Sequence, residues 1–273
     1  APVEPCEFLH ATPQGEGDLT QFCGPAEATF IRTDALAFDL RTELTALGDL
    51  AVGKTTAFDL RIIGPAAEPI AVNDIATSHD EKIHLIAIDA SLEDYHHVHP
   101  QPLNDPAQFR FSLTPGKPGE YRLYIEFVSL RTNRVVMLTE RLAVPGKGEV
   151  PQFNGTLSQT LDAGLAVGVD LPAGGLRAGR RSEIGLTLAH APNGQPPVLE
   201  PDMASYAHLV LFDAKRAGLA HLHPVDYPIA TEPRALDRLR FSIRLDEPGN
   251  YRLWAQFQTG GQLHYVPFDL QVR

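Results

Sequence analysis

An internal repeat constrains the fold of this chain more than any other feature. The stretch "HLIAIDASLEDYHHVHP" begins at His84, and a near copy, "HLVLFDAKRAGLAHLHP", begins at His208. The similarity continues downstream, where "PGEYRLYIEF" (118–127) matches "PGNYRLWAQF" (248–257). Each copy is about 120 residues long, which is too long for a solenoid repeat and suits a whole domain. The sequence therefore predicts two domains that share one fold.

Residues within each copy alternate between apolar and polar side chains. In "EYRLYIEFV", Leu123, Ile125 and Phe127 share one face with Tyr121, while charged residues share the other, as in a half-buried strand. Proline (23) and glycine (22) are plentiful, which favours turns, and no amphipathic helix is apparent. We expect seven strands in the first copy, near 36–43, 55–63, 83–89, 96–99, 109–113, 121–128 and 135–144.

A tyrosine follows a Pro-Gly pair at the same place in both copies. Tyr121 and Tyr251 match the tyrosine corner of immunoglobulin-like and fibronectin type III sandwiches, whose hydroxyl bonds to nearby backbone. The predicted fold class is all-β, with two tandem immunoglobulin-like (fibronectin type III-like) Greek-key β-sandwiches. We place them at 36–146 and 156–273, with a linker at 147–155 and a separate N-terminal segment at 1–35.

The composition narrows the range of partners. With 23 basic and 34 acidic residues the net charge is −11, so the chain repels phosphate backbones, and we expect no nucleic-acid partner. No apolar run approaches the roughly 20 residues of a transmembrane helix, so we expect no transmembrane segment. The chain begins at Ala1 without a signal peptide, as a processed or a trimmed chain would.

Both cysteines lie in the N-terminal segment. A disulfide between Cys6 and Cys23 would staple a stretch that is otherwise rich in Gly and polar residues, and it implies an oxidising compartment. We expect the stapled segment to dock on the first sandwich. The alternative is a metal site formed by Cys6, His10 and Cys23, although a structural zinc site normally has four ligands.

The repeated phrase carries three histidines at the same spacing in each copy. A hairpin centred near Leu92 places His84 opposite His99, and His97 shares a face with His99 because the two are two positions apart. The sequence thus predicts a first trio of His84, His97 and His99. The same construction predicts a second trio of His208, His221 and His223.

Three imidazoles with an open fourth position suit Zn(II) or Cu(II). His79 lies five residues before the first trio begins, and Met203 holds the matching position in the second copy, so both are candidate fourth ligands. A thioether is a soft ligand and favours copper over zinc. Asp89 and Asp213 also match, and they either orient a ligand imidazole or cap the turn.

Other interpretations remain open. The histidines can be structural residues that bond loop carbonyls, in which case the chain is an interaction module for a protein or a carbohydrate. A metal-dependent enzyme is a third hypothesis, but the chain lacks G-x-S-x-G and H-E-x-x-H motifs, and we predict no catalytic residues. Elemental analysis of the purified protein separates these hypotheses.

The pattern H-L-x-x-x-D, then H-x-H-P, then P-G-x-Y-R-L resembles the YtkA-like and related His-x-His-Pro sandwich proteins of bacteria. The resemblance covers roughly 50–146 and 175–273. It implies a periplasmic or secreted location, a role in heavy-metal and copper handling, and another envelope protein as a candidate partner. His79 stands where such a protein would have Met. The resulting hypothesis is a metal-binding protein for sequestration or delivery, with one site per domain, copper favoured and zinc the alternative.

Overall fold

β-Strands make up almost all of the regular structure in the computed structural model, which describes residues 28–33, 39–190 and 193–273. The predicted all-β class is confirmed: the described residues contain no α-helix, and two short 3-10 turns, Val72–Asp74 and Asp162–Gly164, interrupt the strands. The described chain divides into two units. Residues 33–151 form the N-terminal unit, and residues 28–32 with 152–273 form the C-terminal unit.

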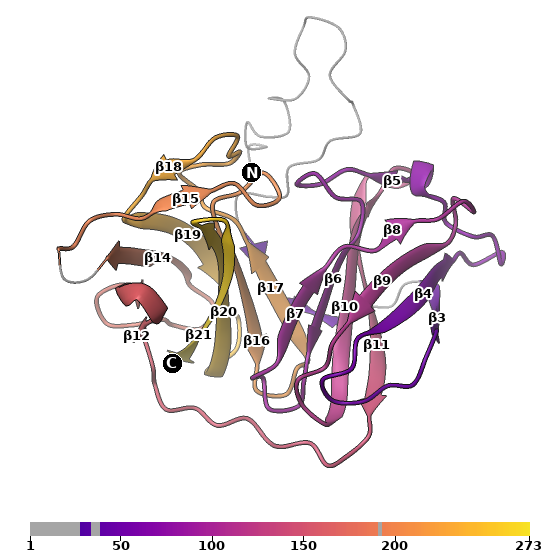
Figure 1. The fold of residues 1–273 in the computed structure, drawn as a ribbon, viewed down its shortest axis with the longest axis horizontal. Helices are drawn as coiled ribbons and strands as arrows, with labels where there is room; N and C mark the ends of the chain where they lie inside the picture. The colour runs from indigo at the N-terminus through magenta and orange to yellow at the C-terminus, as the bar shows by residue number, and fades with distance from the viewer. Residues whose placement is uncertain (1–27, 34–38, 191–192) are drawn as a thin grey trace, which may run out of the picture. The chain divides into compact units, whose positions relative to one another are not determined.

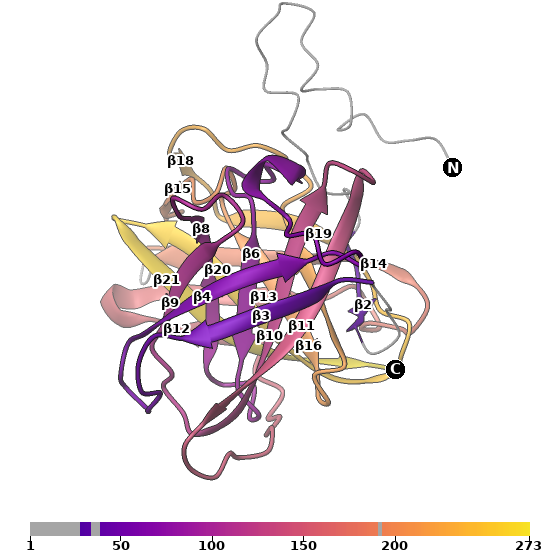
Figure 2. The ribbon, with the colours of Figure 1, turned by 90° about the vertical axis from the view of Figure 1, so that its right-hand side faces the viewer.

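Two sheets make up the N-terminal unit. One has the strand order β3-β4-β9-β8 and the other the order β11-β10-β6-β7, with β5 pairing to β10. Figure 2 looks onto the layer that contains β3 and β4, and β10 and β11 cross behind it. The strands are β3 (Arg41–Ala46), β4 (Thr56–Ile63), β5 (Ile75–Ala76), β6 (His84–Ile88), β7 (Tyr95–Val98), β8 (Gln101–Pro102), β9 (Phe109–Leu113), β10 (Gly119–Ser129) and β11 (Arg134–Val144).

The C-terminal unit repeats this plan with additional strands. One sheet has the order β1-β19-β14-β13-β12, and the other has β18-β15-β20-β16-β17-β2, with β21 pairing to β20. Figure 1 labels β16, β17, β20 and β21 of the second sheet. The strands are β1 (Ala28–Thr29), β2 (Ile31–Arg32), β12 (Ser158–Thr160), β13 (Leu165–Asp170), β14 (Arg181–His190), β15 (Val198–Glu200), β16 (His208–Asp213), β17 (Gly218–Leu222), β18 (Arg234–Ala235), β19 (Arg238–Arg244), β20 (Gly249–Thr259) and β21 (Gln262–Val272).

Alternating side chains from the two sheets of each unit meet in a single core. In the N-terminal unit, Phe58 and Leu60 of β4 pack in one buried cluster with Leu123 and Ile125 of β10. In the C-terminal unit, β14 of one sheet and β16 of the other contribute to one cluster in the same way. Each unit is therefore a two-layer sandwich, while the finer immunoglobulin-like description stays a prediction.

Six of the seven predicted strands of the first copy appear near their expected positions, as β4, β6, β7, β9, β10 and β11. The strand predicted at 36–43 is seen instead as β3, from Arg41 to Ala46, and residues 34–38 lie outside the described part. The short strands β5 and β8 were not predicted, because each has only two residues, too few to show the alternation of apolar and polar side chains that identifies a strand.

The end of the N-terminal segment, residues 28–32, pairs with the C-terminal unit, whereas the stapled stretch that we expected to dock on the first sandwich lies outside the described residues. β1 pairs in parallel with β19, and β2 pairs antiparallel with β17. The ring of Phe30 contacts that of Tyr251 edge-on, with 5.6 Å between centroids. A Cβ at Gly218 would overlap the carbonyl oxygen of Ile31, so glycine admits this strand. Cys6, His10 and Cys23, with the predicted disulfide, lie outside the described residues.

Both predicted tyrosine corners form. The backbone N–H of Lys117 donates to the Tyr121 hydroxyl at 3.0 Å, and that hydroxyl donates to the carboxylate of Asp94. The Tyr251 hydroxyl donates to the carbonyl oxygen of Glu247 at 2.9 Å. Burial raises the pKa of Tyr251 to about 12. In each unit the bond spans four residues and closes the turn before the longest central strand.

Among the described residues, no helix is long and apolar enough to cross a lipid bilayer.

Candidate metal centres

Two hairpins carry the histidine trios. In the first, β6 and β7 pair Ile86 with His97 and Leu85 with Val98, so the next position along the register joins His84 to His99. The sequence-based register is therefore correct. The second hairpin, β16 and β17, pairs Val210 with His221 and Leu209 with Leu222, so that its next position joins His208 to His223.

The trios lie on the sheet faces that point away from the cores. Leu85 and Ala87 of β6 belong to the core of the N-terminal unit, and successive side chains of a strand point to opposite faces. His84 and Ile86 therefore share the outer face, and His97 joins them because directly paired residues lie on one side. In the C-terminal unit Leu209 and Leu211 are core residues, and His208 is on the outer face.

The first trio is compact and mostly buried. The ring centroids are 5.4 Å apart for His84 and His97, 5.0 Å for His84 and His99, and 4.7 Å for His97 and His99. Nδ1 of His84 lies 3.2 Å from Nε2 of His97, which is close to the spacing of two nitrogens bound to one ion. His84 and His97 are buried, and His99 is half-buried.

The second trio repeats this arrangement. The ring centroids are 5.5 Å apart for His208 and His221, 4.8 Å for His208 and His223, and 4.7 Å for His221 and His223. Nδ1 of His208 lies 3.3 Å from Nε2 of His221. One ring nitrogen of each histidine lies within 4.8 Å of the other two, a grouping that can hold a metal ion.

A backbone carbonyl orients the first histidine of each trio. Nε2 of His84 is 3.0 Å from the carbonyl oxygen of Ser78, and Nε2 of His208 is 3.0 Å from that of Asp202. Because a carbonyl only accepts, Nε2 carries the proton and Nδ1 presents its lone pair to the other rings. In metal sites, a hydrogen bond from the ring nitrogen that does not bind the metal fixes the tautomer of the imidazole in the same way.

The carbonyls belong to two matching tight turns. Ser78 and Glu81 bond reciprocally, N to O at 2.8 and 3.1 Å, and Asp202 and Ser205 do the same at 2.8 and 3.0 Å. The two central residues of each turn have positive φ. The values are 49° at His79 and 64° at Asp80 in the first turn, and 51° at Met203 and 54° at Ala204 in the second. The sequence-matched pair thus occupies the same turn position, and the residue before each supplies the carbonyl. Ligation by His79 or Met203 stays a prediction.

Asp89 and Asp213 cap turns, which is one of the two roles left open by the sequence. The Asp89 carboxylate accepts the backbone N–H groups of Ser91, Glu93 and Asp94 at 2.8 to 2.9 Å. Asp213 accepts those of Lys215 at 2.9 Å and Gly218 at 3.1 Å. Both carboxylates therefore hold the hairpin turns at the end of the strands opposite to the trios.

Polar residues beside the trios were missed by the sequence analysis. On β10, Glu126 pairs directly with His84, and on β20, Gln256 pairs directly with His208. The Gln256 amide donates to the carboxylate of Asp202 at 2.8 Å. Burial raises the pKa of that carboxyl, and the Gln256 bond opposes the rise in part. The signal available was the repeat itself, which aligns "YIEF" with "WAQF".

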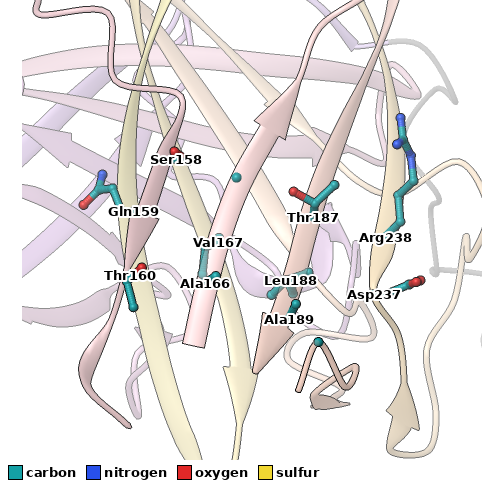
Figure 3. A pocket seen from close by; sticks show the side chains of 12 residues that line it. Ser158, Gln159, Thr160, Ala166, Val167, Thr187, Leu188, Ala189, Asp237 and Arg238 are labelled. Atoms are coloured by element: carbon teal, nitrogen blue, oxygen red, sulfur yellow. The ribbon is translucent and has the colours of Figure 1, made fainter. Parts of the chain in front are cut away.

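A surface depression of the C-terminal unit lies on its other sheet, which does not carry the second trio. It measures about 600 Å³ and is lined by small side chains of β12, β13 and β14, together with Asp237 and Arg238 (Figure 3). Arg238 is engaged by Asp170 at 2.6 Å. The depression contains no histidine of either trio and offers no cluster of metal ligands or nucleophiles.

A family model described as "Domain of unknown function (DUF8832)" matches the chain over residues 37–143 and 159–273. No curated protein matches. Similar solved structures include a Salmonella alpha-2-macroglobulin mutant (9% identity, TM-score 0.27), a putative membrane anchored protein from Corynebacterium diphtheriae (9%, 0.24) and a Parabacteroides merdae beta-glucuronidase (10%, 0.22). They cover 85 to 86% of this chain, which spans only 15%, 57% and 24% of their respective lengths. At these TM-scores the likeness does not define a shared fold.

Proposed function

This chain belongs to the family described as "Domain of unknown function (DUF8832)", and we propose that each of its two repeats binds one transition-metal ion through its histidine trio. The observation that carries the proposal is the duplicated tautomer contact. His84 and His208 each give Nε2–H to a turn carbonyl at 3.0 Å and turn Nδ1 toward a second histidine at 3.2 or 3.3 Å. In both repeats these contacts leave a ring nitrogen with its lone pair facing a second imidazole, as a shared metal ion requires.

The arrangement suits an exchangeable ion. In the neutral pair, Nε2–H of His97 donates to Nδ1 of His84, and a bound cation takes the place of that proton. Three imidazoles leave a fourth position open, whereas structural zinc sites close it with a fourth protein ligand. An open position allows a ligand of another molecule to attach before the ion leaves. The role we propose is therefore sequestration or delivery.

Copper is the favoured ion and zinc the alternative. Both accept imidazole nitrogen, and the difference rests on Met203, which follows Asp202 in the turn beside His208 and whose soft thioether would favour copper if it took the fourth position of the second trio. The resemblance to envelope metal-handling proteins supports a periplasmic or secreted location and an envelope partner. That location also suits the predicted disulfide between Cys6 and Cys23.

Metal stoichiometry tests the proposal. The full chain, produced without a histidine tag, is stripped with a chelator, dialysed against Zn(II), Cu(II) or anaerobic Cu(I), and measured by elemental analysis. We expect one ion per trio. His99→Ala and His223→Ala each remove one ion, because each deletes a half-buried ligand at the end of a hairpin.

His190→Ala is the matched control, since His190 lies on β14, in the sheet opposite to the second trio. It should leave the stoichiometry unchanged. A chain that retains no metal after reconstitution, or trio variants that bind as much as the wild type, would overturn the proposal and favour an interaction module with structural histidines.

A further inference from the structure

The two trios match closely, but the acidic residues around them do not. Glu126 lies directly opposite His84 across the β6–β10 ladder, on the face that carries the first trio. Residues paired in this way have Cβ atoms about 4.5–5.5 Å apart. At the last position of the Ser78 turn, a carboxylate oxygen of Glu81 lies 4.0 Å from Nδ1 of His99. Two carboxylates thus flank the first trio.

The C-terminal unit has uncharged side chains at both places. Gln256 holds the position of Glu126, opposite His208, and Ser205 holds the position of Glu81 in the turn. The Ser205 hydroxyl donates to the carbonyl oxygen of Ala207 at 2.9 Å. A carboxylate is present in this turn at Asp202, and the buried amide of Gln256 donates to it at 2.8 Å.

Basic side chains do not remove this difference. Lys82, next to Glu81, donates its ammonium to the carbonyl oxygen of Ile75 at 2.8 Å. Arg122 of β10 and Arg252 of β20 lie four positions before Glu126 and Gln256 respectively, so each strand carries an arginine at the same place. The first trio therefore has the more negative surroundings.

Resting on the proposed function, we infer that the two centres are specific for different ions. The first trio, with Glu126 and Glu81, holds a divalent cation, Zn(II) or Cu(II). The second trio, with Gln256 and Ser205, holds Cu(I). Glu126 is the residue that determines this specificity, because it stands beside His84 in the middle of the sheet.

The physical basis is charge. A carboxylate attracts a doubly charged ion twice as strongly as a singly charged ion at the same distance, and partial burial weakens the screening by water. Hard oxygen donors also favour divalent ions over Cu(I), which prefers neutral nitrogen and sulfur. The measured quantity is thus the ratio of Zn(II) affinity to Cu(I) affinity at each trio.

The experiment uses the full chain with one trio disabled. His223→Ala leaves the first trio intact, and His99→Ala leaves the second. Zn(II) and Cu(I) affinities are measured by competition with a chelator for each ion. We expect a higher ratio of Zn(II) to Cu(I) affinity at the first trio. Glu126→Gln should lower that ratio on the order of tenfold or more, mainly by weakening Zn(II).

Gln256→Glu is the reverse change, and it should raise the ratio at the second trio. If Gln256→Glu binds Zn(II) more tightly than its parent, misfolding cannot be the cause, because a misfolded variant would lose affinity. Glu120→Gln removes the same charge from the same strand six residues away, and its ratio should stay close to that of the parent. The urea midpoint of each variant monitors folding.

The outcomes separate this inference from the proposed function. Ions bound at both trios with equal ratios, or a Glu126→Gln variant whose Zn(II) affinity equals its parent's, overturn the inference and leave metal binding intact. Failure of both single-trio chains to bind either ion overturns the proposed function and the inference with it.

Discussion

A single carbonyl oxygen decides which nitrogen of His84 faces the other histidines. The spacing of the repeat predicted that His84 would lie opposite His99, and the register bears this out. It did not predict that Ser78 would accept Nε2–H, because that contact depends on how the preceding turn folds back. The orientation of a candidate ligand therefore depends on the neighbouring backbone carbonyl as well as on the position of the histidine in the strand.

Met203 provides a test of ligand type. Leucine keeps its volume but removes the sulfur, so Met203→Leu should fold normally and lower the Cu(I) affinity of the second trio while leaving Zn(II) nearly unchanged. Competition with a Cu(I) chelator in the His99→Ala chain measures this. Met137→Leu, which changes a buried methionine of β11 in the N-terminal unit, is the control. Equal Cu(I) affinities in all three chains would remove Met203 from the site.

The tyrosine corners differ in one partner, which gives a prediction for stability. Tyr121 donates to Asp94, and Tyr251 donates to a backbone carbonyl. Tyr121→Phe leaves the half-buried Asp94 carboxylate without this donor, so we expect a loss of about 2 kcal/mol in unfolding free energy, against about 1 kcal/mol for Tyr251→Phe. Urea titration of the two variants measures the difference, and equal losses would contradict it.

The same carboxylate makes the effect depend on pH. Burial raises the pKa of Asp94, but hydrogen bonds from His96 and Tyr121 outweigh it and leave the pKa lowered. A lowered pKa means that this contribution is present above the unfolded value near 3.8 and is lost as the pH falls through the lower folded value. The gap between the two tyrosine variants should therefore narrow at acid pH.

At the scale of the strand hairpin, an aspartate caps the turn in both repeats, but it accepts more hydrogen bonds in the first repeat than in the second. Asp89 is buried, and it accepts three backbone N–H groups and the Ser91 hydroxyl in the β6–β7 turn. Asp213 accepts two backbone N–H groups in the β16–β17 turn. Because turn geometry sets hairpin register, these caps also hold the paired histidines opposite one another.

Asp89→Ala should therefore cost more than Asp213→Ala. We expect losses of about 3 and about 1 kcal/mol in unfolding free energy, because the first substitution leaves more buried donors unsatisfied. The Zn(II) affinity of the first trio should fall with Asp89→Ala. Urea titration and chelator competition measure the two effects. If Asp213→Ala lowers the unfolding free energy as much as Asp89→Ala does, the number of hydrogen bonds that the carboxylate accepts does not determine the loss of stability.

At the scale of the chain, a buried ion pair holds the segment that enters the C-terminal unit. Arg252 and Asp269 bond at 2.8 Å, with side chains 8% and 6% exposed. Asp269 also accepts the N–H groups of Asn154 and Gly155, and Arg252 donates to the carbonyl oxygen of Gln152 at 2.7 Å. Residues 152–155 are thereby held against β20 and β21.

Asp269→Asn should destabilise the C-terminal unit by about 3–5 kcal/mol, because it leaves the Arg252 guanidinium buried without its counter-charge. Asp170→Asn, which breaks the exposed pair with Arg238, should cost about 0–1 kcal/mol. Urea titration with tryptophan fluorescence reports on this unit through Trp254. Equal costs for the two variants would refute the argument.

The sequence by itself determined the strands, the duplication and the histidine trios. Alternation of apolar and polar residues located β4, β6, β7, β9, β10 and β11, and the turn centred near Leu92 set the pairing of β6 with β7. These features are local, because side chains alternate with a period of two and a short turn leaves one register that buries the apolar face. That is why the trios could be predicted from spacing.

The tertiary structure decided every contact across a long connection. Glu126 meets His84 only because β10 pairs with β6, although residues 89–118 separate the two strands in the sequence. Residues 28–32 join the C-terminal unit far along the chain, where Gly218 leaves room for their backbone. No local period encodes such pairings, since many strand edges can accept the same hydrogen bonds. Packing of the whole sandwich selects one of them, and with it the acidic residue beside the first trio.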